Sequence, residues 1–375
     1  SIDTLNECNN RAADIMKELI TISEESGHAM DEVSNETERT NASAQEIRKV
    51  TEIIAGITTF LAMAYILAVN PSYLGGIDGM SAGAVFSATA ISAGIATLCM
   101  AFFANYPVAL ASGMGLNAFF AFTVCGAMGY SYKVALTAVF IEGIIFMLLS
   151  LFKFREALVN KIPSNLKFAI TAGIGLFIAI IALLNANVVV ASESTTVALG
   201  ELSSPTVVLS LVGLLIIGAL QHYKVPGGIL LGILITWVLG IIAQLVGWYV
   251  PNPEAGVYSV IPQFSLSSFE APKMFQFDFG FIAKNVPAFI LIVFTFLYTD
   301  IFDTVGTLIG VAEKGKLLDK DGSLPNATGA LMADAVGTVV GACFGTSTVT
   351  SYVESSAGVA AGGRTGLTAV TTAVL

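Results

Sequence analysis

The chain has 375 residues, of which 55% are hydrophobic and 12% charged, and its net charge is −10. Soluble domains carry about 45–50% apolar and about 25% charged residues, so this composition excludes an ordinary soluble protein and predicts a polytopic membrane protein. The cysteines are scattered, the histidines are isolated, and no HExxH, GxSxG or GxxxxGK motif occurs. The sequence therefore gives no support to zinc, hydrolase or ATPase chemistry, and we expect no enzyme and no metal site.

Residues 1–50 differ from the rest of the chain and hold most of the acidic excess. Apolar side chains such as Ile15, Leu19 and Ile22 recur there at helical steps, which predicts an amphipathic or coiled-coil helix. The text SEESGHAMDEVSNETERTNASAQEIRKVTEII resembles the cytoplasmic signalling helices of methyl-accepting chemotaxis receptors. It belongs either to a sensor fused to a membrane unit or to an accidental join of two genes. We favour the join, because half a coiled-coil hairpin cannot bury its own apolar face.

From Ile53 onward, apolar runs of membrane-spanning length predict ten spans and the start of an eleventh at Thr365. We place the ten spans at residues 53–69, 82–104, 108–127, 134–152, 167–190, 205–221, 226–249, 283–311, 326–344 and 346–361. Most basic residues then fall on one side, which by the positive-inside rule is cytoplasmic and includes the N-terminus. They are Arg48, Lys49, Lys153, Arg155, Lys161, Lys167, Lys224, Lys314, Lys316, Lys320 and Arg364. The exceptions, expected outside, are Lys133, Lys273 and Lys284.

Two of the predicted spans begin with an extended segment instead of a helix. The third opens with PVALASGMGLN from Pro107, and the tenth opens with GTSTVTSYVE from Gly345. Extended backbone at membrane depth is tolerated only where it lines a cavity or is buried in protein. The two spans are seven apart, as expected for two inverted seven-span repeats, and paired interrupted spans point to the binding site of a transporter. The alternative is that the small residues only permit close helix packing.

A polar stripe interrupts the eighth span. Asp300, Asp303, Thr304 and Thr307 follow the i, i+3, i+4, i+7 spacing that places side chains on one helical face. An aspartate at the middle of a spanning helix costs ~2.5–3.5 kcal/mol on insertion scales, so this face should meet a cavity or another helix and not lipid. The alternative is a helix end at which the acids lie in the membrane interface.

Two further acids, Glu142 and Asp334, fall within the fourth and ninth predicted spans. Each is either a proton relay or a packing acid bonded to Ser, Thr or backbone groups, and we favour the packing role. Gly337 and Gly341 in the ninth span lie four residues apart, a spacing that indicates close helix approach.

The resemblance to a known transporter family rests on four texts, TEIIAGITTFLAMAYILAVNP, ASGMGLNAFFAF, FLYTDIFDTVGTL and ALMADAVGTVVGACFGTSTVTSYVESSAGVAAGGRTGLTAV. They resemble the AzgA-like purine permeases of the nucleobase:cation symporters, from about Thr51 to Leu375. The resemblance implies an all-α fold of two inverted seven-span repeats, with a core (spans 1–4 and 8–11) and a gate (spans 5–7 and 12–14). We expect residues 1–50 to be a foreign helix and 51–375 a C-terminally truncated transporter domain. Because half of the gate would be missing, we expect this chain alone not to transport.

The resemblance also implies a function and a site. It implies a multi-pass protein of the plasma membrane that imports a purine base, such as guanine, hypoxanthine or adenine, by proton symport. The implied partners are the base, the lipid bilayer and a second copy joined through the gate, with no nucleic acid and no cofactor beyond the coupled proton. The predicted substrate-binding residues are Asp300, Glu354, Asn117, Gly115, Asp303, Thr348 and Ser347, and the predicted proton-coupling residues are Asp300, Glu142 and Asp334.

The hydrogen-bonding groups of a purine suit the predicted substrate-binding residues. A carboxylate accepts hydrogen bonds from ring N–H groups, half-helix N-termini offer free backbone N–H donors, and Asn117 supplies a donor and an acceptor. Phe119 or Phe120 could stack on the ring. We predict that Glu354, at a half-helix start, stays ionised and binds the base, while Asp300 carries the proton. The alternative for Glu354 is a capping box, SYVE, in which it only closes the helix start.

Two other functions compete with purine import. A membrane chemosensor would need a complete signalling hairpin, which residues 1–50 do not provide. An anion carrier on the related fold would want a basic residue at mid-span near Glu354, whereas Arg364 falls at the cytoplasmic end. The side chains do not choose among adenine, guanine, hypoxanthine and xanthine.

Overall fold

The computed structural model describes residues 2–151, 164–192, 195–223, 225, 228–252, 259–261, 270–320 and 323–375. Lys153, Arg155, Lys161 and Lys224, which entered the predicted topology, lie outside the described residues. The chain divides into two compact units, Ser1–Thr51 and Glu52–Leu375.

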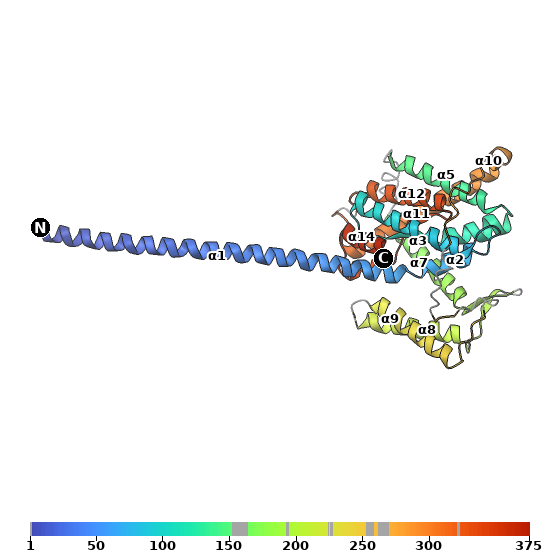
Figure 1. Ribbon diagram of the computed structural model, residues 1–375, viewed down its shortest axis with the longest axis horizontal. Helices are drawn as coiled ribbons and strands as arrows, with labels where there is room; N and C mark the ends of the chain where they lie inside the picture. Colours follow the sequence, from blue (N-terminus) through green and yellow to red (C-terminus); the bar gives the residue numbers. More distant parts are fainter. Residues whose placement is uncertain are drawn as a thin grey trace. The chain divides into compact units, whose positions relative to one another are not determined.

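The described residues are mostly helical, with four short strands among them (Figure 1). The elements are α1 (Ile2–Met63), α2 (Ile66–Leu74), α3 (Ala82–Ala104), β1 (Leu110–Ser112), α4 (Met114–Ala118), a π-helix η1 (Phe119–Ala127), α5 (Tyr132–Leu151), α7 (Ser164–Asn185), β2 (Val189–Ser192), β3 (Thr196–Leu199), α8 (Pro205–His222), α9 (Gly228–Leu245), α10 (Gly280–Lys284), α11 (Val286–Gly315), α12 (Ala327–Phe344), β4 (Val349–Ser351), α13 (Ser355–Ala360) and α14 (Gly366–Val374). Among the described residues, 6 helices are long and apolar enough to cross a membrane.

The first unit is a continuous helix, the N-terminal part of α1. Residues 34–50 are exposed, and they include the apolar Ile47 and Val50. The helix predicted for residues 1–50 is therefore present.

The first predicted span is broken. Helix α1 ends at Met63 and α2 begins at Ile66, with a turn at Ala64 and Tyr65 between them. Within the turn the N–H of Ala68 donates to the carbonyl of Tyr65 at 3.0 Å, which is the shorter, three-residue spacing of a tightened helix. The span predicted over 53–69 lies within one stretch that is long and apolar enough to cross a membrane, and it carries a turn at Ala64 and Tyr65.

The extended openings of the third and tenth spans pair with each other. Strands β1 and β4 are antiparallel, with Leu110 opposite Ser351 and Ser112 opposite Val349. Each strand is fully buried and leads into a short helix, α4 after β1 and α13 after β4. The predicted extended segments are therefore confirmed, and their backbone groups are satisfied by pairing inside the protein.

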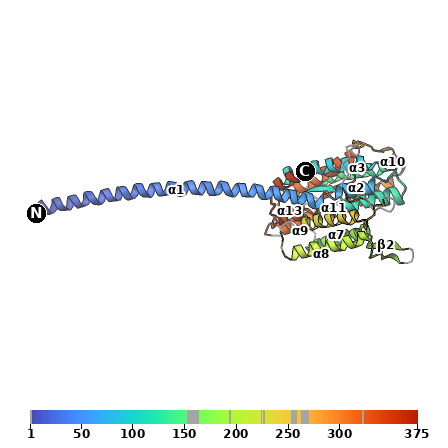
Figure 2. The same ribbon diagram turned by 60° about the horizontal axis from the view of Figure 1, so that its bottom comes forward.

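Helix α12 packs against both α3 and α5, and α11 packs against α5 and α7 (Figures 1 and 2). Glycines allow the close approach of α12. A Cβ added at Gly337 would lie 2.8 Å from the Cβ of Ala96 on α3, and one at Gly341 would lie 2.7 Å from Val349 on β4. The prediction for these two glycines is confirmed. The elements expected in the gate are represented by α7, α8 and α9, of which α8 and α9 pack against each other.

Two apolar clusters support the strand pair. One joins α3, α11, α12 and the strands, and includes Met100, Leu308 and Leu331. The other joins η1, α5 and the first half of α11, and includes Phe120 and Phe296. The strands are thus held in a packed interior, and α11 runs through both clusters.

Candidate functional site

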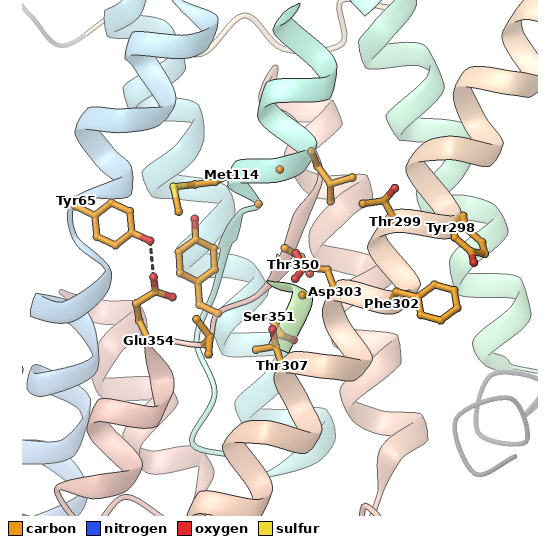
Figure 3. A pocket seen from close by; sticks show the side chains of 16 residues that line it. Tyr65, Met114, Tyr298, Thr299, Phe302, Asp303, Thr307, Thr350, Ser351 and Glu354 are labelled. Atoms are coloured by element: carbon orange, nitrogen blue, oxygen red, sulfur yellow. Dashed lines mark hydrogen bonds between the residues drawn. The ribbon is translucent and has the colours of Figure 1, made fainter. Parts of the chain in front are cut away.

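A cavity of about 480 Å³ opens where the turn after α1, the start of α4, the middle of α11 and the β4–α13 connection meet (Figure 3). This volume lies in the range of small-molecule sites, about 300–1,000 Å³. Its lining residues are Tyr65, Gly113, Met114, Gly115, Leu116, Gly173, Tyr298, Thr299, Phe302, Asp303, Thr307, Thr350, Ser351, Tyr352, Val353 and Glu354. Gly173 belongs to α7, so the cavity lies between the predicted core and one helix of the predicted gate.

Glu354 lies immediately before α13 and lines the cavity. Its carboxylate accepts a hydrogen bond from the Tyr65 hydroxyl (Figure 3). The capping-box interpretation is wrong, because the N–H of Ser351, which Glu354 would have bonded, donates to Asp334 Oδ1 at 2.9 Å instead. The Glu354 side chain is therefore available to the cavity.

Only part of the polar stripe on α11 meets the cavity. Asp303 and Thr307 line it, whereas Asp300 and Thr304 are fully buried behind them. The Thr304 hydroxyl lies 3.5 Å from Asp300 Oδ1 and 2.9 Å from the Thr350 hydroxyl. The stripe spans enough of the helix circumference that one edge faces the cavity and the other faces protein.

Asp334 joins three elements behind the cavity. Its Oδ1 accepts from the Ser351 N–H at 2.9 Å and from the Ser351 hydroxyl at 3.0 Å, and its Oδ2 accepts from the Thr304 hydroxyl at 2.7 Å. These bonds connect α12 to β4, which leads into the connection that holds Glu354, and to α11, which carries Asp303. The arrangement matches the packing role favoured for this acid, because a carboxylate bonded in this way fixes the elements that supply its donors.

The other predicted site residues lie at different depths. Gly115 lines the cavity. Asn117 is fully buried, with its side-chain N–H group 3.5 Å from the Ser112 carbonyl. Ser347 and Thr348 are fully buried as well, and the Thr348 carbonyl accepts from the Gly113 N–H at 3.0 Å. Glu142 on α5 is also fully buried and does not line the cavity. Their roles in binding or proton coupling remain predictions.

The aromatic lining differs from the expected one. Phe120 is fully buried in an apolar cluster and Phe119 packs edge-on against Phe296, with ring centroids 4.9 Å apart, so neither lines the cavity. Aromatic surface comes instead from tyrosines such as Tyr65 and Tyr352. Sequence reasoning missed both. The signals were a tyrosine within the apolar segment FLAMAYILAVNP and a tyrosine two residues before the half-helix acid Glu354.

The cavity is acidic. Asp303 from α11 and Glu354 from the β4–α13 connection both line it, and no Lys, Arg or His is among the described lining residues. Acids and hydroxyls offer hydrogen-bond acceptors to a ligand with N–H groups, and aromatic rings offer flat apolar surface. An anion would meet two carboxyl groups without a counter-charge.

The chain forms a bundle of apolar helices in which two extended segments pair, and each leads into a short helix beside a cavity. This arrangement is typical of a membrane transporter. The family comparison is more specific. A model described as the Permease family matches residues 50–375, and the chain therefore belongs to the Permease family.

Two relatives are named after the bases that they transport. The guanine/hypoxanthine permease PbuO of Bacillus subtilis is 47% identical over 331 residues, which covers 86% of this chain and 73% of that protein. The adenine permease AdeQ of Escherichia coli is 44% identical over 325 residues, which covers 87% of this chain and 70% of that protein. The predicted relationship to the purine permeases is confirmed.

A solved structure shares the fold. The transmembrane domain of a cyanobacterial bicarbonate transporter, BicA, aligns with a TM-score of 0.59 at 18% identity and covers 86% of this chain and 80% of that chain. The predicted all-α inverted-repeat class is confirmed. The family match begins at residue 50, and these matches give no support to the chemotaxis-receptor resemblance of residues 1–50.

Proposed function

We propose that this chain is a secondary transporter that imports a purine nucleobase across the cell membrane. The observation that carries the proposal is the acidic, aromatic-lined cavity in which Asp303 and Glu354, from α11 and from the connection between β4 and α13, face the same space. The names of PbuO and AdeQ support a purine as the ligand. The absence of a basic residue among the described lining residues argues against the anion carrier.

The base lies in the cavity with its N–H edge toward Glu354 and its ring against the tyrosine rings. Glu354 accepts from ring N–H groups, and Asp303 on the facing helix supplies a second acceptor. Thr350 and Ser351 add hydroxyl groups at the same wall. This arrangement matches a flat molecule with polar edges and apolar faces.

Proton coupling is the second part of the proposal. Asp300 is fully buried one helical turn before Thr304, whose hydroxyl also contacts Asp334 at 2.7 Å. We assign the coupled proton to Asp300, with Glu142 as the alternative and Asp334 as the structural anchor. Movement of the gate against the core around the fixed cavity then exposes the site to either side of the membrane.

The proposal also assigns a role to each segment of the chain. Residues 51–375 form the transporter domain, and residues 1–50 are a helix that transport does not require. The protein is a multi-pass protein of the plasma membrane, and its N-terminus lies in the cytoplasm. Two copies join through the gate in the bilayer.

Equilibrium binding of radiolabelled hypoxanthine to the purified chain in detergent tests the proposed substrate. Unlabelled guanine, adenine and xanthine are the competitors, with uracil and bicarbonate as controls. Competition by at least one further purine, with none by bicarbonate, is expected. Displacement by bicarbonate, or the absence of purine binding to a folded chain, would contradict the proposal.

A further inference from the structure

Glu52 on α1 is a buried acid whose partners follow α13 in the chain; its side chain is 8% exposed. Glu52 Oε1 accepts a hydrogen bond from the Arg364 N–H at 3.0 Å. Glu52 Oε2 accepts from the Thr365 N–H at 3.2 Å and from the Thr368 hydroxyl. Thr365 is the N-cap of α14, and the N-terminus of a helix attracts negative charge. Glu52 therefore fixes the connection between α13 and α14.

This connection is bonded back to α13 through Arg364. The Arg364 guanidinium donates to the carbonyl of Val359, in the last turn of α13, at 2.6 Å, and to the Gly363 carbonyl at 2.6 Å. Gly362 and Gly363 precede Arg364, and Gly362 has a φ of 112°, which glycine adopts without strain. Because glycines leave the backbone conformationally free, the bonds of Glu52 and Arg364 decide where this end of α13 lies.

Helix α13 also contacts α1 along its length and at its start. A Cβ added at Gly358 would lie 2.5 Å from the Ala55 carbonyl oxygen, so the two backbones touch three residues after Glu52. Glu354, immediately before α13, accepts a hydrogen bond from the Tyr65 hydroxyl (Figure 3). A helix of 6 residues is not stable by itself, so the position of α13 depends on contacts of this kind.

We propose that Glu52 is a positioning residue that fixes α13 so that Glu354 meets the bound base in the correct geometry. The inference rests on the proposed function, in which Glu354 accepts hydrogen bonds from the base. Glu52 does not line the cavity, so it acts through Glu354 and makes no contact with the base.

The substitution Glu52→Ala tests the inference, because it removes both acceptor oxygens. Dissociation constants for hypoxanthine are measured on the purified full chain, at a temperature at which the wild type and the variant are both folded. A misaligned hydrogen bond is weaker, so the affinity should fall by roughly three- to tenfold, part of the loss expected when a charged hydrogen bond is removed. Glu46→Ala, which removes an exposed acid from the same helix, is the matched control and should bind like the wild type.

A double-mutant cycle separates positioning from a general loss of structure. In a Glu354→Gln background the charged acceptor is already gone, so Glu52→Ala should change the affinity by less than about twofold. The thermal unfolding midpoint should fall by the same amount in both backgrounds, because the bonds of Glu52 to the α13–α14 connection are lost in each. Glu52→Gln keeps one acceptor oxygen and should weaken binding less than Glu52→Ala does.

Two outcomes would overturn the inference. An unchanged affinity in Glu52→Ala would show that Glu52 does not influence the site, and an equal loss in both backgrounds would show that it acts on the fold and not through Glu354. If Glu52→Ala does not fold, Glu52→Gln is judged by the same two outcomes. A wild-type chain that is folded but does not bind hypoxanthine would contradict the proposed function itself, so the wild-type measurement separates the two failures.

Discussion

At the scale of single residues, the site depends on which acids reach the cavity. Glu354 does so because the donor that a capping box would have used, the Ser351 N–H, is bonded to Asp334. The sequence pattern left two roles open for Glu354, capping and binding. Asp334 on α12 leaves Glu354 free for binding, because it accepts the hydrogen bond that a capping box would need.

Glu354→Gln should weaken binding of the base roughly ten- to a hundredfold, because one charged acceptor becomes partly a donor. The amide oxygen can still accept from Tyr65, so we expect the fold to persist. Glu313→Gln, the same change at an exposed position near the end of α11, is the control. Hypoxanthine titrations of both variants check this, and an unchanged affinity in Glu354→Gln would contradict the assignment.

The two aspartates of α11 provide a matched pair. Asp303→Asn should weaken base binding, because Asp303 lines the cavity, whereas Asp300→Asn should leave binding nearly intact and abolish accumulation against a gradient. Binding to this chain, and counterflow in proteoliposomes by a version extended to the length of relatives such as PbuO, separate the two effects. Accumulation driven by a pH gradient in Asp300→Asn would show that the proton is carried elsewhere, with Glu142 the next candidate.

At the scale of elements, the sequence predicted what depends on local pattern. Helix α3 has the bounds expected for the second span, and the small and β-branched residues from Gly345 form the expected extended segment. The sequence did not predict the break at Tyr65 or which edge of the α11 stripe meets the cavity. Rotation of a helix about its axis is set by its packing partners, here α5 and α7, and periodicity fixes only which residues share a face.

The close packing of α12 gives a stability prediction. Gly337→Ala would place a methyl group 2.8 Å from the Ala96 Cβ, so α12 or α3 must shift, at a cost of about 1–3 kcal/mol. Gly218→Ala on α8 is the control, because a Cβ there meets nothing within 4 Å and alanine favours the helix. Thermal unfolding in detergent should give a lower midpoint for Gly337→Ala and an equal or higher one for Gly218→Ala. Equal midpoints for Gly337→Ala and the wild type would show that the contact is not tight.

At the scale of the whole molecule, the two compact units divide the chain between Thr51 and Glu52, and the family match begins at residue 50. Removal of residues 1–50 should leave the affinity for hypoxanthine unchanged, since the residues that line the cavity all lie after it. Binding to the shortened chain, compared at equal folded concentration, checks this. A large loss of affinity would show that the N-terminal helix contributes to the transporter unit.

The central claim is that the purine occupies the cavity between α11 and the β4–α13 connection. Thr299 lines this cavity and is exposed, whereas Thr295, one helical turn earlier on α11, does not line it. Thr299→Cys and Thr295→Cys, in a background without the native cysteines, are alkylated by a maleimide with and without hypoxanthine. We predict that hypoxanthine slows alkylation at position 299 severalfold and leaves position 295 unaffected. Equal rates at position 299 with and without hypoxanthine, in a variant that binds the base, would place the base elsewhere and contradict the account.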